Sequence, residues 1–162
     1  MKNVEHAKKR SSVLLFIFLA ALYAHSRRHL EDDTKSDSNC KDIARQLIEN
    51  EPGKKLNVIM GGGLRSFICD SPGRRQDCRN LTIEWIEEHR NGEFIENRSQ
   101  MMNISSDTEY VLGIFASSHM HFNFDRNEEE EPSLAEMTDT AIKILKRKNS
   151  NGFLLMVEGG KI

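Results

Sequence analysis

The chain has 162 residues and carries 23 Lys and Arg side chains against 25 Asp and Glu, a formal net charge of -2. That length suits one domain or part of a larger one, and it excludes a complete large enzyme. The near-neutral balance provides no electropositive field that would hold nucleic acid, so we expect no nucleic-acid partner.

The first 26 residues have the pattern of a secretory signal peptide. Basic residues precede an unbroken apolar run, Val13–Ala24, and Ala24 and Ser26 place small side chains at the spacing that signal peptidase prefers. The run is too short for a helix that crosses about 30 Å of hydrocarbon, which takes about 20 residues. We therefore predict a cleaved signal over residues 1–26, a folded part over residues 27–162, and export to the cell surface or extracellular space.

Three cysteines and three glycosylation sequons agree with export. Cys69 and Cys78 bracket a short loop and are predicted to close it as a disulfide-bonded hairpin. Cys40 then has no partner among these cysteines. It is a free thiol, it forms an intermolecular disulfide, or its partner lies on sequence that is absent here. The Asn-x-Ser/Thr sequons begin at Asn80, Asn97 and Asn103.

A helix is predicted before Pro52, because apolar residues fall on one helical face there. The capping candidates are Asp37, Ser38 and Asn39, and the apolar face comprises Ile43, Ala44, Leu47 and Ile48. An apolar, β-branched run at 56–60 then predicts a buried strand that stops at Gly61–Gly63.

The second half of the chain repeats this alternation. A helix is predicted at 81–90, then strands at 93–96 and 109–115, and a last buried strand at 153–157. The acidic run 128–131 is predicted to be a solvated loop. Ser133 and Glu136 form a capping box for a helix that reaches Lys148. The apolar positions of the helix at 81–90 are Ile83, Trp85 and Ile86.

Apolar strands that alternate with helices indicate an α/β fold, with a largely parallel sheet flanked by helices. Ligands of such folds bind at the carboxyl ends of the strands. Glu158 directly follows the last predicted strand, so its carboxylate is a candidate metal ligand or catalytic acid, with an ordinary surface residue as the alternative.

Two other motifs have simpler interpretations. Gly61–Gly63 lacks the spacing of a P-loop or of a dinucleotide site, so we interpret it as a tight turn. His119 and His121 share one face of an extended segment, with Asp125 nearby, a spacing that can chelate a divalent metal. We favour two surface histidines.

Three stretches, 57–63, 131–137 and 152–162, closely resemble stretches of the animal alkaline phosphatases, in the same order. Segments 40–48, 97–99 and 110–115 follow the intervening pattern, so the resemblance covers residues 37–162. It implies part of an alkaline-phosphatase-like fold, incomplete in this chain. It also implies a secreted, glycosylated homodimer, commonly lipid-anchored, that hydrolyses phosphate monoesters.

The same resemblance implies a site with two zinc ions, which activate a serine nucleophile and then a water, and a supporting magnesium ion. Glu158 matches the family's magnesium-ligating glutamate, and Cys40 matches a disulfide cysteine whose partner lies further upstream. The nucleophilic serine precedes the matching region, and the zinc-ligating run is expected after Ile162. We therefore expect this chain alone to be inactive.

Two departures from the family's pattern concern anion and cation binding. The run Tyr23–Ser26 resembles a family segment that precedes the phosphate-binding arginine, and this match competes with the signal peptide. Without a gap the position of that arginine falls on His29, and a one-residue gap places it at Arg28. Ala116 stands where vertebrate members have a calcium-site glutamate, while Glu131 matches an acidic position, so calcium is not expected. The alternative to a phosphatase fragment is a short secreted glycoprotein without catalysis.

Overall fold

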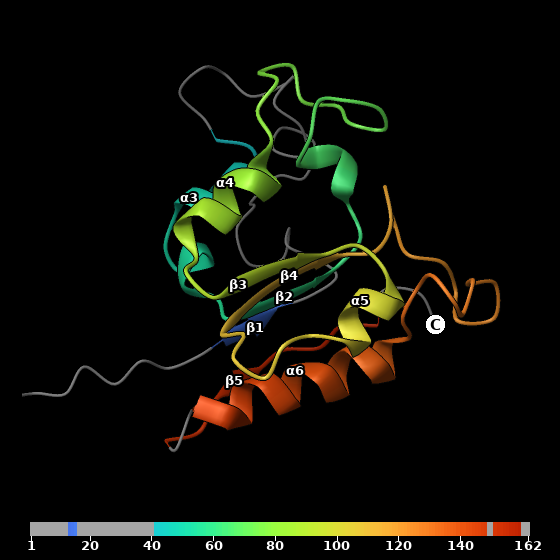
Figure 1. Ribbon diagram of the computed structural model, residues 1–162. Helices are drawn as coiled ribbons and strands as arrows, with labels where there is room; N and C mark the ends of the chain where they lie inside the picture. The colour runs from blue at the N-terminus through green and yellow to red at the C-terminus, as the bar shows by residue number, and fades with distance from the viewer. Residues whose placement is uncertain (1–12, 16–40, 149–150, 160–162) are drawn as a thin grey trace, which may run out of the picture.

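The computed structural model describes residues 13–15, 41–148 and 151–159, and these form a sheet with helices on both faces (Figure 1). The strand order is β3-β4-β2-β1-β5, and all four pairings are parallel. The predicted α/β fold with a parallel sheet is therefore confirmed. The strands are β1 (Val13–Leu15), β2 (Val58–Gly61), β3 (Gly92–Ile95), β4 (Tyr110–Ile114) and β5 (Leu154–Leu155).

The strand β1 lies inside the segment that the sequence predicts to be a signal peptide. It pairs with β2, where Leu14 is opposite Val58, and with β5, where Leu14 is opposite Leu155. The strand β1 thus lies between β2 and β5 in the sheet. The export role of residues 1–26 stays a prediction.

Helices cover both faces of the sheet: α3 and α4 lie on one face, and α5 and α6 lie on the other (Figure 1). No helix in the described part of the chain is long and apolar enough to cross a membrane. The helices are α3 (Ile43–Glu49), α4 (Leu81–Glu88), α5 (Arg98–Met102) and α6 (Leu134–Lys148), with 3-10 turns η1 (Gly53–Lys55) and η2 (Leu64–Ser66).

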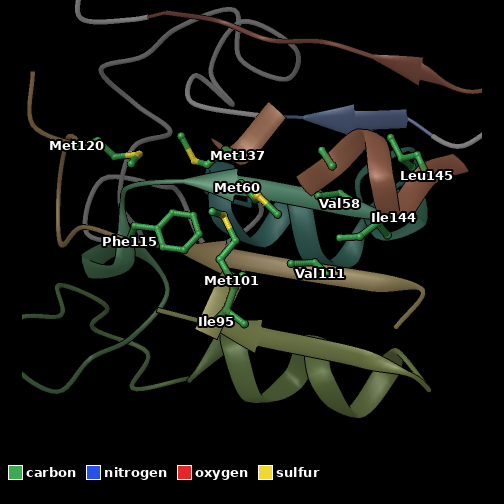
Figure 2. Packing of buried hydrophobic residues seen from close by; sticks show 11 residues of the cluster. Val58, Met60, Ile95, Met101, Val111, Phe115, Met120, Met137, Ile144 and Leu145 are labelled. Carbon is green, nitrogen blue, oxygen red and sulfur yellow. The ribbon is translucent and has the colours of Figure 1, made fainter. Parts of the chain in front are cut away.

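Alternate residues of each central strand point to opposite faces of the sheet and enter different cores. Val58 and Met60 of β2 pack with the α6 cluster, whereas Ile59 packs with the α3 and α4 cluster. Figure 2 shows the α6 side, where Phe115 and Met101 lie beside Met60. The α6 cluster is Val58, Met60, Ile95, Met101, Val111, Phe115, Met120, Met137, Ala141, Ile144 and Leu145. The opposite cluster is Ala44, Leu47, Ile48, Leu56, Ile59, Phe67, Leu81, Trp85, Leu112 and Ile114.

The helix α3 buries the face that the sequence predicts, but its cap is Asp42. The Asp42 side chain accepts the Arg45 backbone N–H at 3.0 Å. The predicted cap candidates at 37–39 lie outside the described residues. The buried face comprises Ile43, Ala44, Leu47 and Ile48, as predicted.

The helix α4 exposes two of its three predicted apolar positions. Ile83 is 54% exposed and Ile86 is 37% exposed, so only Trp85 of the three lies in the core. Leu81 is fully buried with Trp85, because residues four apart share a helical face and Ile83 lies on the opposite one.

The capping box of α6 is confirmed. The Glu136 N–H donates to Ser133 Oγ at 3.2 Å, and the Ser133 N–H donates to Glu136 Oε2 at 2.9 Å. The last strand is shorter and more exposed than predicted. Leu154 of β5 is 60% exposed, so the prediction of a buried strand is wrong there, since β5 lies at the sheet edge with β1 as its neighbour.

Candidate functional site

Parallel α/β folds bind their ligands at the carboxyl edge of the sheet. In the described part of the chain, the loops that follow β2, β4 and β5 leave this edge, as does the short link from β3 to α5. Because Gly61 is in register with Ile114, the loops after β2 and β4 start side by side. The loop after β5 carries Glu158.

Glu158 presents an open carboxylate at this edge. Its side chain is exposed, and it has no hydrogen bond or ion pair with any residue that the structure describes. Carboxylate oxygens are the ligands that magnesium takes in proteins. This exposure fits a cation ligand and equally the alternative of an ordinary surface residue, so the metal role of Glu158 stays a prediction.

The glycine loop after β2 packs against the loop after β4. The N–H groups of Gly63 and Leu64 donate to the Ala116 carbonyl at 2.9 and 3.1 Å. A Cβ on Gly62 would lie 2.2 Å from the Ser118 carbonyl oxygen, so glycine is required there. The interpretation as a tight turn is confirmed, because the Gly63 amide binds the Ala116 carbonyl and the Gly62 backbone packs against that of Ser118.

Glu131 is buried, contrary to the solvated loop predicted for the run 128–131. Its Oε1 accepts the His121 backbone N–H at 2.7 Å, and its Oε2 lies 2.8 Å from His121 Nδ1. Glu131 is 5% exposed, whereas residues 128–130 are exposed as predicted. Sequence reasoning missed this contact because it joins residues ten apart within an irregular loop.

The two histidines of the loop do not assemble a metal site with Asp125. His121 contacts Glu131, and within the described ranges no group of three or more His, Cys, Asp or Glu side chains could hold a metal ion. Ala116 offers no carboxylate, and both Glu131 oxygens are engaged by His121. These contacts support the prediction that calcium does not bind here, which stays a prediction.

A buried ion network, which the sequence does not reveal, joins α3 to the loop between η2 and α4. Arg75 Nη2 lies 3.0 Å from Asp42 Oδ2 and 2.6 Å from Asp77 Oδ2. Burial alone would lower the pKa of Arg75, but the hydrogen bonds to Asp77 and Asp42 outweigh it and raise that pKa. Burial would likewise raise the pKa of Asp77, but Arg75 outweighs it and holds that pKa below its usual range.

Cys69 and Cys78 lie together at the two ends of the predicted hairpin. Both side chains are thiols in this structure. A hydrogen bond with Cys78, helped by burial, raises the pKa of Cys69 to about 11. The structure brings the two sulfur atoms together, and the disulfide itself stays a prediction.

The remaining predicted site residues fall into two groups. Arg28 and Cys40 lie outside the described residues. The three sequon asparagines all lie at helix ends: Asn80 caps α4, Asn97 caps α5, and Asn103 ends α5 with an exposed side chain.

Comparison with known proteins places this fold in one family. The sequence profile described as "Alkaline phosphatase" matches residues 19–162. The membrane-bound alkaline phosphatase of Bombyx mori is 39% identical over 148 residues, which cover 82% of this chain and 27% of that protein. The alkaline phosphatase of Gadus morhua is 40% identical over 141 residues, 78% of this chain and 29% of that protein.

A solved structure shows the same fold. The crystal structure of Thermus thermophilus alkaline phosphatase superposes with a TM-score of 0.60 at 24% sequence identity, covering 90% of this chain and 28% of that one. The chain therefore belongs to the alkaline phosphatase family. It spans less than a third of the length of these relatives.

Proposed function

We propose that this chain is part of an alkaline phosphatase that hydrolyses phosphate monoesters through a phosphoserine intermediate, with two zinc ions and one magnesium ion. The observation that supports this function most is the family match over residues 19–162. The relatives named above are all alkaline phosphatases, which agrees with that activity.

Glu158 is the residue of this chain that we assign to the metal centre, as a magnesium ligand. Its exposed carboxylate at the carboxyl edge of the sheet fits a hard cation, which prefers oxygen ligands. A bound magnesium ion supplies positive charge that supports phosphoryl transfer. Since the described residues contain no cluster of three or more metal-binding side chains, we assign the zinc ligands to other parts of the parent protein.

The role of Glu158 is tested in the full-length parent protein. Glu158→Gln should reduce bound magnesium, measured by inductively coupled plasma mass spectrometry, and lower turnover of p-nitrophenyl phosphate by at least about 100-fold. Glu130→Gln changes another exposed carboxylate in the same way and should leave both quantities unchanged. Wild-type magnesium content in Glu158→Gln would rule out this assignment.

The 162-residue chain by itself should not hydrolyse p-nitrophenyl phosphate or bind zinc stoichiometrically. The physical reason is that the described residues supply no donor set for zinc. Turnover by the isolated chain at the rate of the parent enzyme would contradict this proposal.

We further propose that the parent is a homodimer that is exported by residues 1–26 and acts at the cell surface or outside the cell. The Bombyx mori relative is described as membrane-bound, which supports a surface location. Attachment of the parent to the membrane would use a lipid anchor outside this sequence.

A further inference from the structure

The pair Cys69 and Cys78 has no part in phosphatase chemistry, yet the fold brings the two side chains into contact. They hydrogen bond to each other, although eight residues separate them along the chain. Cys69 is half-buried, and Cys78 is exposed.

Backbone hydrogen bonds hold the two limbs of this loop together beside Cys69. The N–H groups of Arg74 and Arg75 donate to the Ile68 carbonyl at 3.0 and 3.2 Å. A Cβ on Gly73 would lie 2.1 Å from the same carbonyl oxygen, so the turn approaches its first limb too closely for a side chain. The loop therefore returns to its starting point with a fixed geometry.

Ion pairs fix the chain on both sides of Cys78. Asp77 binds Arg75 and also accepts the Arg79 backbone N–H at 3.1 Å. The Arg79 side chain in turn binds Glu49 of α3 at 2.7 Å. Cys78 itself has a φ of 52°, in the left-handed region that residues with side chains seldom adopt. Such a conformation persists only where the surroundings impose it, and here it coincides with contact between the two thiols.

We propose that Cys69 and Cys78 form a disulfide bond in the exported protein, which closes loop 69–78 and holds Arg75 against Asp42. This bond rests on the proposed export, because disulfides persist in oxidising compartments. The thiols are already in contact, and the ion pairs around Asp77 keep the second limb of the loop in place.

The oxidant is a disulfide compound such as glutathione disulfide. The exposed Cys78 thiolate attacks it and forms a mixed disulfide, and one glutathione thiolate leaves. Exposure assigns the first attack to Cys78, because its side chain is open to the solvent whereas Cys69 is half-buried. Cys69 then loses its proton and attacks the Cys78 sulfur, and the second glutathione thiolate leaves. Two protein thiols are oxidised, one disulfide is reduced to two thiols, and the two protons pass to the departing thiolates.

Tryptic mapping of the full-length protein tests this bond directly. The protein is first reduced and then equilibrated in a glutathione buffer with a redox potential of about -200 mV, which is that of the secretory pathway. The remaining free thiols are then alkylated with N-ethylmaleimide. Trypsin cleaves after Arg65, Arg74, Arg75 and Arg79. Peptides 66–74 and 76–79 should then have one combined mass, which separates into two after reduction. Because the oxidation is done on purified protein, this result does not depend on export or on phosphatase activity.

Two outcomes would overturn the proposal. One is that both peptides have N-ethylmaleimide adducts after equilibration. The other is that either peptide is linked to peptide 36–41, which contains Cys40.

A second experiment measures the thermal stability of the protein. Dithiothreitol should lower the melting temperature of the full-length wild-type protein by roughly 2–4 °C more than that of Cys69→Ser/Cys78→Ser, because closure of the loop restricts the unfolded chain. Cys40→Ser is the matched control. Dithiothreitol should lower the melting temperature of Cys40→Ser by as much as it lowers that of the wild-type protein.

Discussion

Arg75 and Asp42 form a bidentate ion pair across 33 residues of sequence, with Nη1–Oδ1 and Nη2–Oδ2 distances of 3.2 and 3.0 Å. Both side chains are 1% exposed. Asp42 also accepts the Arg45 N–H at the start of α3, so the pair joins the cap of that helix to loop 69–78. Loss of Arg75 would leave the Asp42 carboxylate buried without its counterion, whereas loss of Asp42 would leave Arg75 paired with Asp77 alone.

Arg75→Met should therefore lower the free energy of unfolding by about 3 kcal/mol, because Asp42 would keep its burial and lose its cation. Urea denaturation followed by circular dichroism measures the change. Arg74→Met is the matched control, since Arg74 is exposed and contributes only its backbone N–H to the loop. Equal stability of the two variants would show that the buried pair contributes nothing.

The acid sensitivity of the fold should depend on Glu49. Burial would raise the pKa of Glu49, but hydrogen bonds from Lys41, Arg45 and Arg79 outweigh it and lower the pKa from 4.5 to about 2. A carboxyl with a lower pKa in the folded chain stabilises the fold above pH 4.5, and that contribution is lost as the pH falls towards 2. Glu49→Gln should cost about 1 kcal/mol at pH 7 and almost nothing near pH 2.

The matched control for this pH dependence is Glu51→Gln, which removes an exposed carboxylate of the same region. Its cost should be smaller than that of Glu49→Gln at pH 7. Denaturation curves at several pH values between 2 and 7 give the comparison. A cost of Glu49→Gln that stayed constant over this range would contradict the role assigned to its ion pairs.

The sequence predicts the strands β2 and β4 to within two residues at each end, because both are continuous apolar runs bounded by turn signals. It also predicts the start of α6, since Ser133 and Glu136 form a local signal three residues apart. It does not predict α5, whose five residues are too few to show a helical period.

The parts that the sequence does not predict depend on tertiary contacts. Arg75 and Asp42 are 33 residues apart, and neither belongs to a motif. The burial of Glu131 depends on a loop that folds back to place His121 beside it. The candidate ligand Glu158 could be located from the pattern of a strand followed by glycines, whereas the exposure of β5 follows from its place at the edge of the sheet.

The short helix α5 is flanked by two predicted glycosylation sites, and their Ser residues allow a clean test. Asn97 caps α5 through its side-chain oxygen, which accepts the Gln100 N–H at 2.9 Å, so replacing Asn97 would damage the helix. Ser99→Ala removes the sequon and keeps the cap. Ser105→Ala does the same for Asn103. In secreted protein, each substitution should remove the mass of one N-glycan.

Intact mass spectrometry before and after enzymatic glycan release measures these losses. The Asn103 side-chain nitrogen donates to the Ser99 carbonyl at 2.8 Å and has a second hydrogen, so attachment of a glycan leaves that bond possible. An unchanged glycan mass in both variants would contradict glycosylation at these two positions.

The mature N-terminus decides the role of residues 1–26. Export with signal cleavage should give a protein that begins at Arg27 and lacks β1, so that β2 and β5 lose the strand between them. N-terminal sequencing of the secreted protein measures this directly. A mature protein that retains residues 13–15 would contradict the signal peptide and would leave the segment in the sheet.

The central claim, that this sequence belongs to a working alkaline phosphatase, is tested most directly by the mass of the native polypeptide. An antibody raised against residues 64–131 would identify the mature protein after its glycans are removed. We predict a polypeptide several-fold heavier than the 18.6 kDa of this chain, because the chain spans only 27% and 29% of two relatives. A polypeptide of 18.6 kDa or slightly less would contradict that account and would indicate a short glycoprotein without catalysis.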